Sequence, residues 1–158
     1  MDAAALFDDA RRRLDGTPRE ALGRRELPGR VRSALGARPR IVPAGEAWRL
    51  GILLLADDAV LAAGEILRAA AERRRGFTSE ASRRRAELQA MCARGGFAEG
   101  ATVNIDSTPL DLDLLAAGGR TGPLEMRGTQ VLVHWTPGAD PMSLEAYLDE
   151  RIRLLPDL

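Results

Sequence analysis

Three segments of the chain carry apolar residues at the spacing of one helical face. The first spans residues 2–15, the second spans residues 79–94, and the third begins at Asp140–Pro141. Asp2 precedes the first segment and Thr78 the second, and both residue types accept hydrogen bonds from the free N–H groups of a helix start. Each pattern predicts an amphipathic helix with its apolar face turned to a core.

Shorter apolar runs in the middle of the chain predict strands. Residues 48–55 predict one buried strand, and Asp57–Asp58 predicts the turn that follows it. Residues 60–71 then predict a second strand, which completes a hairpin. A helix is the alternative for this alanine-rich run, because periodicity does not separate the two in short apolar segments.

The second half of the chain predicts a strand, a short helix and another hairpin. The strand covers residues 101–105. Residues 108–111 have the form of a capping box with proline at the first helical position, which predicts a helix from there to Ala117. The hairpin pairs residues 124–126 with residues 130–135.

Residues 17–45 differ from the rest of the chain. Four prolines and, counting Gly16 just before the segment, five glycines interrupt any long helix or strand there. The segment contains seven arginines but only two acidic residues, both glutamates. This pattern predicts an extended basic arm with little regular structure. The expected organisation is therefore an N-terminal helix and arm in residues 1–45, followed by one compact domain in residues 46–158.

Taken together, the elements predict an α+β fold. We expect a mainly antiparallel sheet made of two hairpins and a short strand, with the helices packed on one face. A length of 158 residues and an apolar fraction of 45% are sufficient for one buried core.

The charges of the chain are balanced but unevenly distributed. All 23 basic residues are arginines, so lysine-dependent chemistry such as a Schiff base or a phosphate-loop lysine is excluded. Residues 1–45 hold 10 arginines against 6 acidic residues, whereas residues 99–158 hold 4 against 10. The opposed charges predict self-association as a homodimer or larger assembly. A net charge of zero argues against a general nucleic-acid binder, although the basic arm keeps that alternative open.

The cysteine content and the N-terminal residues bear on location. A single cysteine excludes an internal disulfide, and the acidic start does not resemble a signal peptide. The longest strongly apolar run, residues 50–56, is too short to cross a bilayer. These features predict a cytoplasmic protein without a membrane partner.

The candidates for catalysis are a thiol–imidazole pair and an acidic cluster. Cys92 and His134 are the only cysteine and the only histidine, so they form the single conceivable thiol–imidazole pair. Asp106 and Asp111, together with Asp113, could supply an acid and a base. A structural role is the competing interpretation, because Cys92 lies on an apolar helical stripe and acids favour helix starts. With one histidine and no cysteine pair, no metal site and no cofactor are expected.

A candidate anion site precedes the helix predicted at residues 79–94. Arg73, Arg74 and Arg75 lead into Thr78 and the start of that helix. Guanidinium groups beside free backbone N–H groups are suited to a phosphate or a carboxylate. These four residues are the predicted ligand-binding site.

Several longer stretches resemble short actinobacterial proteins described as glutaminases. The stretches are residues 38–43, 48–54, 74–80, 95–100 and 147–151. The resemblance covers most of the chain and implies a shared fold and the hydrolysis of an amide. It transfers no catalytic residue, because the Ser-x-x-Lys pair of serine-type glutaminases cannot exist in a chain without lysine.

The leading hypothesis is a non-catalytic binding or protein-interaction module with an anion site. The alternative is a small amide hydrolase that uses Cys92 or His134 with Asp106 or Asp111. The third hypothesis is a nucleic-acid-binding arm at residues 17–45.

Overall fold

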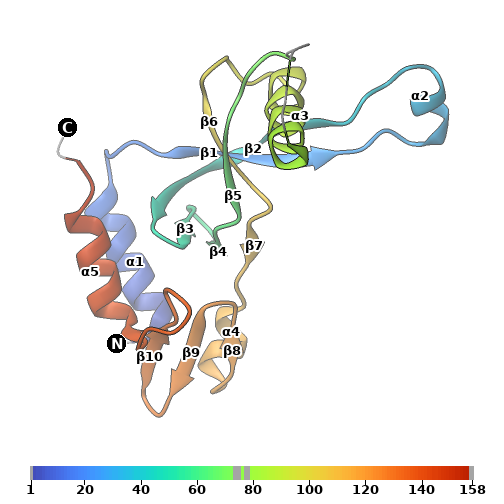
Figure 1. Cartoon of the computed structure of the whole chain (residues 1–158). Helices are drawn as coiled ribbons and strands as arrows, with labels where there is room; N and C mark the ends of the chain where they lie inside the picture. The colour runs from blue at the N-terminus through green and yellow to red at the C-terminus, as the bar shows by residue number, and fades with distance from the viewer. Residues whose placement is uncertain (1, 73–75, 77–78, 157–158) are drawn as a thin grey trace. The chain divides into compact units, whose positions relative to one another are not determined.

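The computed structural model describes residues 2–72, 76 and 79–156 (Figure 1). It contains both helices and strands, and most neighbouring strands are antiparallel, so the predicted α+β class is confirmed. The chain forms two compact units, each built from separate stretches of sequence. Unit 1 comprises residues 1–19, 47–63 and 107–158, and unit 2 comprises residues 20–46 and 64–106.

Unit 1 contains the first and last helices of the chain and two groups of strands. Its helices are α1 (Ala3–Leu14), α4 (Leu112–Ala116) and α5 (Leu144–Arg153). The end of β2 (Arg40–Leu50) lies beside β3 (Leu53–Leu55), then β4 (Val60–Ala62) and β7 (Thr108–Pro109). A second sheet has the order β11 (Met142–Ser143), β10 (Gln130–Val133), β9 (Leu124–Arg127) and β8 (Arg120–Thr121).

The core of unit 1 lies between α1, α5 and these strands. α1 and α5 run side by side (Figure 1), and the predicted apolar faces of both helices point into this core. Phe7, Leu14 and Tyr147 are fully buried in it. Asp2 caps α1 as predicted, accepting a hydrogen bond from the Ala5 N–H at 2.8 Å.

Unit 2 contains four neighbouring strands and the longest helix. The strand order is β5 (Glu65–Arg68), β6 (Thr102–Ile105), β1 (Glu20–Glu26) and the first part of β2. β1 and β6 are parallel, whereas β5 and β6 are antiparallel. α3 (Glu80–Arg94) packs against β5, and a separate apolar core is formed by Ile41, Leu67, Leu88, Met91, Cys92, Val103 and Ile105.

The prediction of an arm with little regular structure at residues 17–45 is wrong. The segment contains β1, the short helix α2 (Arg30–Ala34) and the start of β2. The strands form although Gly23 lies inside β1 and Pro43 and Gly45 lie inside β2, because Leu22 and Ile41 are buried. The other prolines and glycines of the segment lie in loops or next to α2. The two units also do not follow the expected boundary at residue 45.

The single strand predicted at residues 48–55 is a hairpin. β2 turns into β3 at Gly51 and Ile52, and Gly51 adopts a φ of 63°, which glycine accepts without strain. Tyr147 of α5 closes this turn. Its hydroxyl accepts a hydrogen bond from the Ile52 N–H and donates one to the Leu50 carbonyl, both at 2.9 Å.

Residues 60–71 form two strands in place of the one predicted, and the helical alternative is wrong. Only the first strand completes the predicted hairpin, since β4 pairs with β3 whereas β5 pairs with β6. The run is divided into β4 and β5 at Ala63 and Gly64. The strand predicted at residues 101–105 and the hairpin around Arg127–Gly128 are confirmed as β6 and as β9 with β10.

Three predicted helix starts are wrong in detail. The last helix, expected to open at Asp140–Pro141, begins only at Leu144 and is capped by Ser143, which accepts a hydrogen bond from the Ala146 N–H. Ser79, not Thr78, caps α3 and accepts a hydrogen bond from the Ser82 N–H. The proposed capping box at residues 108–111 is absent, because Thr108 and Pro109 form β7 and the helix begins only at Leu112. Asp111 caps this helix itself by accepting from the Leu114 N–H.

Candidate anion-binding site

The loop between β1 and β2 forms one side of a pocket in unit 2. We call residues 27–39 the tip; they include α2, which lies at the far end of the loop from α3 (Figure 1). No residue of α2 is buried. Pro28 and Gly29 precede α2, and Gly36 follows it with a φ of 90°, so the chain reverses direction and enters β2.

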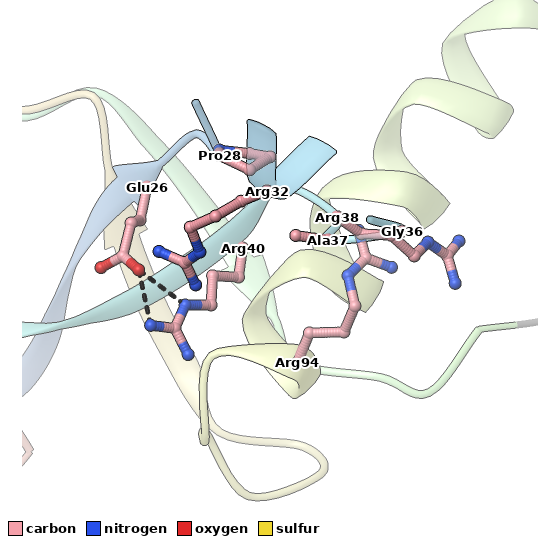
Figure 2. A pocket seen from close by; sticks show the side chains of 8 residues that line it. All are labelled: Glu26, Pro28, Arg32, Gly36, Ala37, Arg38, Arg40 and Arg94. Carbon is pink, nitrogen blue, oxygen red and sulfur yellow. Dashed lines mark hydrogen bonds and ion pairs between the residues drawn. The ribbon is translucent and has the colours of Figure 1, made fainter. Parts of the chain in front are cut away.

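The pocket has a volume of about 360 Å³ and a strongly basic lining. Figure 2 shows its residues, which come from the end of β1, the tip, the start of β2 and the last residue of α3. Four arginines and one glutamate carry the charges; the lining residues are Glu26, Pro28, Arg32, Gly36, Ala37, Arg38, Arg40 and Arg94. Such a lining attracts anions.

Three of the four arginines are paired with carboxylates, namely Arg38, Arg40 and Arg94. Arg40 donates to Oε1 of Glu26 from Nε at 2.9 Å and from Nη2 at 2.5 Å, as drawn in Figure 2. This hydrogen bond holds the pKa of Glu26 below its usual value, so the glutamate stays charged. Arg38 makes a two-pronged contact with Glu72 at 3.0 and 2.9 Å. Both pairs fix the direction of a guanidinium group at the edge of the pocket.

Arg94 is held at the end of α3 but is incompletely satisfied. Its Nε and Nη2 donate to the carbonyl of Pro39 at 3.0 and 2.9 Å, and Nη2 also contacts Glu87 at 2.7 Å. Its Nη1 is buried and has no hydrogen-bond partner among the described residues. Enclosing a charged donor without an acceptor costs free energy.

Arg32 is the second arginine with unused donors. It lies in α2, is exposed, and its guanidinium forms no hydrogen bond or ion pair within the described part of the chain. Its charge does contribute to the lowered pKa of Glu26. Arg32 and Arg40 both line the pocket (Figure 2). Since Glu26, Glu72 and Glu87 pair with the other three arginines, Arg32 is the one arginine of the lining that has no carboxylate partner among the described residues.

The four residues predicted to bind an anion, Arg73, Arg74, Arg75 and Thr78, lie outside the described residues. The pocket belongs to the same unit and is lined by different arginines. Three of the pocket arginines, Arg32, Arg38 and Arg40, belong to the segment that the sequence predicted to be a basic arm. No signal in the sequence indicated that they converge, because the arm was not expected to fold.

The predicted thiol–imidazole pair is divided between the two units, with Cys92 in unit 2 and His134 in unit 1. Cys92 is fully buried, and burial raises the pKa of its thiol to about 11. The thiol is thus protonated at neutral pH, whereas a nucleophilic cysteine must be a thiolate. Its predicted role in core packing agrees with this position.

His134 contacts a carboxylate instead of a thiol. Its Nε2 lies 2.5 Å from Oε2 of Glu125, on the neighbouring strand β9. This hydrogen bond, followed by one from Arg127, lowers the pKa of Glu125. The side chains of His134 and Glu125 are partly buried, and neither residue lines the pocket in unit 2.

The two predicted acidic candidates have structural roles. Asp106 receives a two-pronged hydrogen bond from Arg25 at 2.8 and 2.7 Å, which lowers its pKa. Asp111 caps α4, and Asp113 lies in the first turn of that helix. Within residues 2–72, 76 and 79–156, no group of three or more histidine, cysteine or acidic side chains could hold a metal ion.

The comparisons with known proteins give no match. No protein-family model matches the chain, and neither the curated proteins nor the solved structures contain a significant neighbour. The predicted resemblance to glutaminase-labelled proteins therefore stays a prediction. A search of the described helices found none with the length and apolar character needed to span a bilayer.

Proposed function

We propose that this protein is a non-catalytic binding module that holds a phosphate or carboxylate group in the arginine pocket of unit 2. The observation that carries the proposal is the pair of incompletely satisfied arginines, Arg32 and Arg94. Arg32 offers exposed donors, and Arg94 has an enclosed Nη1 without an acceptor. An oxyanion is the ligand chemistry that supplies acceptors and negative charge together.

The composition of the pocket favours binding over catalysis. Its lining contains no serine, cysteine or histidine. Its one carboxylate, Glu26, has a lowered pKa and is engaged by Arg40, so it is a poor base near neutral pH. No observation favours the amide-hydrolase alternative, which stays a prediction of the sequence together with its candidate residues.

The proposal is tested by titrating ¹⁵N-labelled protein with inorganic phosphate and following the backbone amide resonances. We expect saturable shifts at residues of the tip, the start of β2 and the end of α3. Arg32→Gln should weaken binding at least about fivefold, because a hydrogen bond to a charged group contributes about 1.5–3 kcal/mol before screening by solvent.

Arg83→Gln is the matched control for this substitution. Arg83 is an exposed arginine of the same unit that does not line the pocket. It should leave phosphate affinity unchanged. If phosphate, sulfate and acetate all fail to produce saturable shifts at the pocket, or if both variants weaken binding equally, the proposal is wrong.

A further inference from the structure

The tip exposes three large apolar side chains to solvent. Leu27 is 71% exposed, Val31 is 75% exposed and Leu35 is 82% exposed. Val31 and Leu35 lie one helical turn apart, since the Leu35 N–H donates to the Val31 carbonyl at 3.1 Å, and they therefore project from the same side of α2. Single exposed apolar residues are ordinary, but three within the nine residues that include α2, a helix without a buried residue, indicate a contact surface.

These three apolar residues are next to residues of the arginine pocket in the sequence. Each one directly precedes a residue that lines the pocket: Leu27 precedes Pro28, Val31 precedes Arg32, and Leu35 precedes Gly36. The same short segment thus provides a place for an oxyanion and an apolar surface next to it. A ligand that uses both must carry a negative group adjacent to hydrocarbon.

The charges around the tip require the partner surface to be anionic. Arg24, Arg30 and Arg32 are exposed, and none of them forms a hydrogen bond or ion pair within the part of the chain that the structure describes. Glu26, the one carboxylate of this segment, is already bound by Arg40. Three uncompensated guanidinium groups beside three apolar side chains are complementary to an anionic lipid surface.

We propose that the tip docks on an anionic lipid surface, with a lipid phosphate in the arginine pocket and Leu27, Val31 and Leu35 at the boundary of the acyl chains. This inference rests on the proposed function, because the pocket must bind a phosphate group. The sequence predicted no membrane partner from the lack of a spanning segment. Docking from one side needs no such segment.

The other sources of phosphate use only part of this surface. A soluble phosphate ligand would leave the three apolar side chains in water. A nucleic acid offers phosphates, but the tip contains no phenylalanine, tyrosine or tryptophan on which a base could stack. A phospholipid presents its phosphate directly above hydrocarbon, so it contacts both the pocket and the apolar residues.

The test is flotation of the full chain with vesicles of phosphatidylglycerol and phosphatidylcholine, compared with vesicles of phosphatidylcholine alone. We expect binding to the anionic vesicles only, and a loss of most of it in 0.5 M salt, where the Debye length falls to only a few ångströms. The triple variant Leu27→Ser, Val31→Ser, Leu35→Ser should bind the anionic vesicles at least about tenfold more weakly, because each buried aliphatic side chain contributes to membrane affinity. It should retain its affinity for inorganic phosphate.

Leu154→Ser is the control, because Leu154 is 64% exposed but belongs to unit 1. This variant should bind vesicles as the wild type does. Arg32→Gln should lose affinity for both vesicles and inorganic phosphate.

The outcomes separate the lipid inference from the proposed function. Phosphate binding without vesicle binding would overturn the lipid inference and leave the proposed function standing. Absence of both would overturn both. Vesicle binding that the triple variant does not weaken would overturn the apolar contact, and tighter binding to duplex DNA or to RNA than to anionic vesicles would assign the tip to nucleic acid instead.

Discussion

At the scale of single residues, Asp106 combines a backbone requirement with an electrostatic one. Its φ of 57° is the one left-handed value of a non-glycine residue in the described chain. Its carboxylate is held by Arg25, and both side chains are well exposed to solvent. Asparagine and aspartate tolerate the left-handed region better than other residues with a side chain, so replacing Asp106 by asparagine or by alanine separates the two requirements.

Asp106→Asn should reduce the free energy of unfolding at neutral pH by less than about 1 kcal/mol, because an exposed ion pair is screened. The pKa of Asp106 is lowered from its ordinary value of 3.8 in the folded protein. The ion pair therefore stabilises the folded protein at pH values above the ordinary pKa of 3.8. This stabilisation is lost as the pH falls through the lowered pKa of Asp106. Urea unfolding at several pH values should show the difference between wild type and variant shrinking below about pH 4.

Asp106→Ala is the companion variant. It should cost about 1 kcal/mol more than Asp106→Asn at every pH, because alanine lacks the tolerance for this backbone conformation. Equal stabilities of the two variants would contradict the backbone argument. A difference in unfolding free energy between wild type and Asp106→Asn that does not change with pH would contradict the ion-pair argument.

The sequence predicted the chemical type of individual residues better than their positions. Cys92 was assigned to core packing from its place on an apolar stripe, and it is buried there. The cap of α3 was placed one residue too early, because Thr78 and Ser79 are equally good caps and only the backbone conformation decides between them. The arginines of the pocket could not be assigned, since their convergence depends on the contact of the tip with the end of α3.

At the scale of elements, the end of α3 approaches β2 so closely that a side chain cannot fit. A Cβ atom on Gly95 would collide with the carbonyl oxygen of Ile41, a backbone atom that cannot rotate away. Gly95 itself has a negative φ, so alanine would be free of backbone strain there. Any cost of alanine at this position therefore measures the close packing of α3 on β2.

Gly95→Ala should lower the free energy of unfolding by about 2 kcal/mol or more, because inserting a group into a closely packed contact forces backbone shifts. Gly29→Ala is the matched control, since Gly29 also has a negative φ and a Cβ there would meet nothing within 4 Å. It should change stability by no more than about 0.5 kcal/mol. Denaturant unfolding of both variants provides the measurement, and equal values would show that the close approach is not a constraint.

The three longest helices were predicted well from the sequence because their signal is local, whereas the short helix α2 was missed. The apolar faces of α1, α3 and α5 repeat over several turns and end at recognisable residues. Strand ends were predicted poorly, because a turn such as that at Gly51 interrupts an apolar run without a polar residue. β1 and the start of β2 were missed because their burial depends on partners distant in sequence, such as β6.

At the scale of the whole molecule, the chain has two apolar cores that share no residue. One belongs to unit 1 and the other to unit 2, and the boundary passes through β2 after Glu46. The α+β class followed from the mixture of periodicities along the sequence. The division into units did not, because each unit is assembled from separate stretches that only the tertiary contacts define. The predicted self-association stays a prediction, which sedimentation velocity would check.

The two cores should respond separately to matched substitutions. Leu14 of unit 1 and Leu67 of unit 2 are both fully buried, and replacing either by alanine should cost about 2–5 kcal/mol in its own unit. Native-state hydrogen exchange should show Leu14→Ala reducing the protection of unit 1 amides such as that of Leu54, and Leu67→Ala reducing the protection of unit 2 amides such as that of Val103. Equal losses in both units from either variant would indicate one cooperative structure.

The hydrogen bonds of Tyr147 have a consequence for folding during synthesis on the ribosome. Unit 2 uses no residue beyond Asp106, whereas unit 1 needs α5, whose Tyr147 closes the turn at Leu50 and Ile52. While α5 is still inside the exit tunnel, α1 lacks the helix it packs against and the turn of the β2–β3 hairpin lacks its clamp. Unit 2 should therefore fold before unit 1 on the ribosome. Until α5 emerges, α1 has no helix to pack against, and Phe7 and its apolar neighbours are accessible to chaperones.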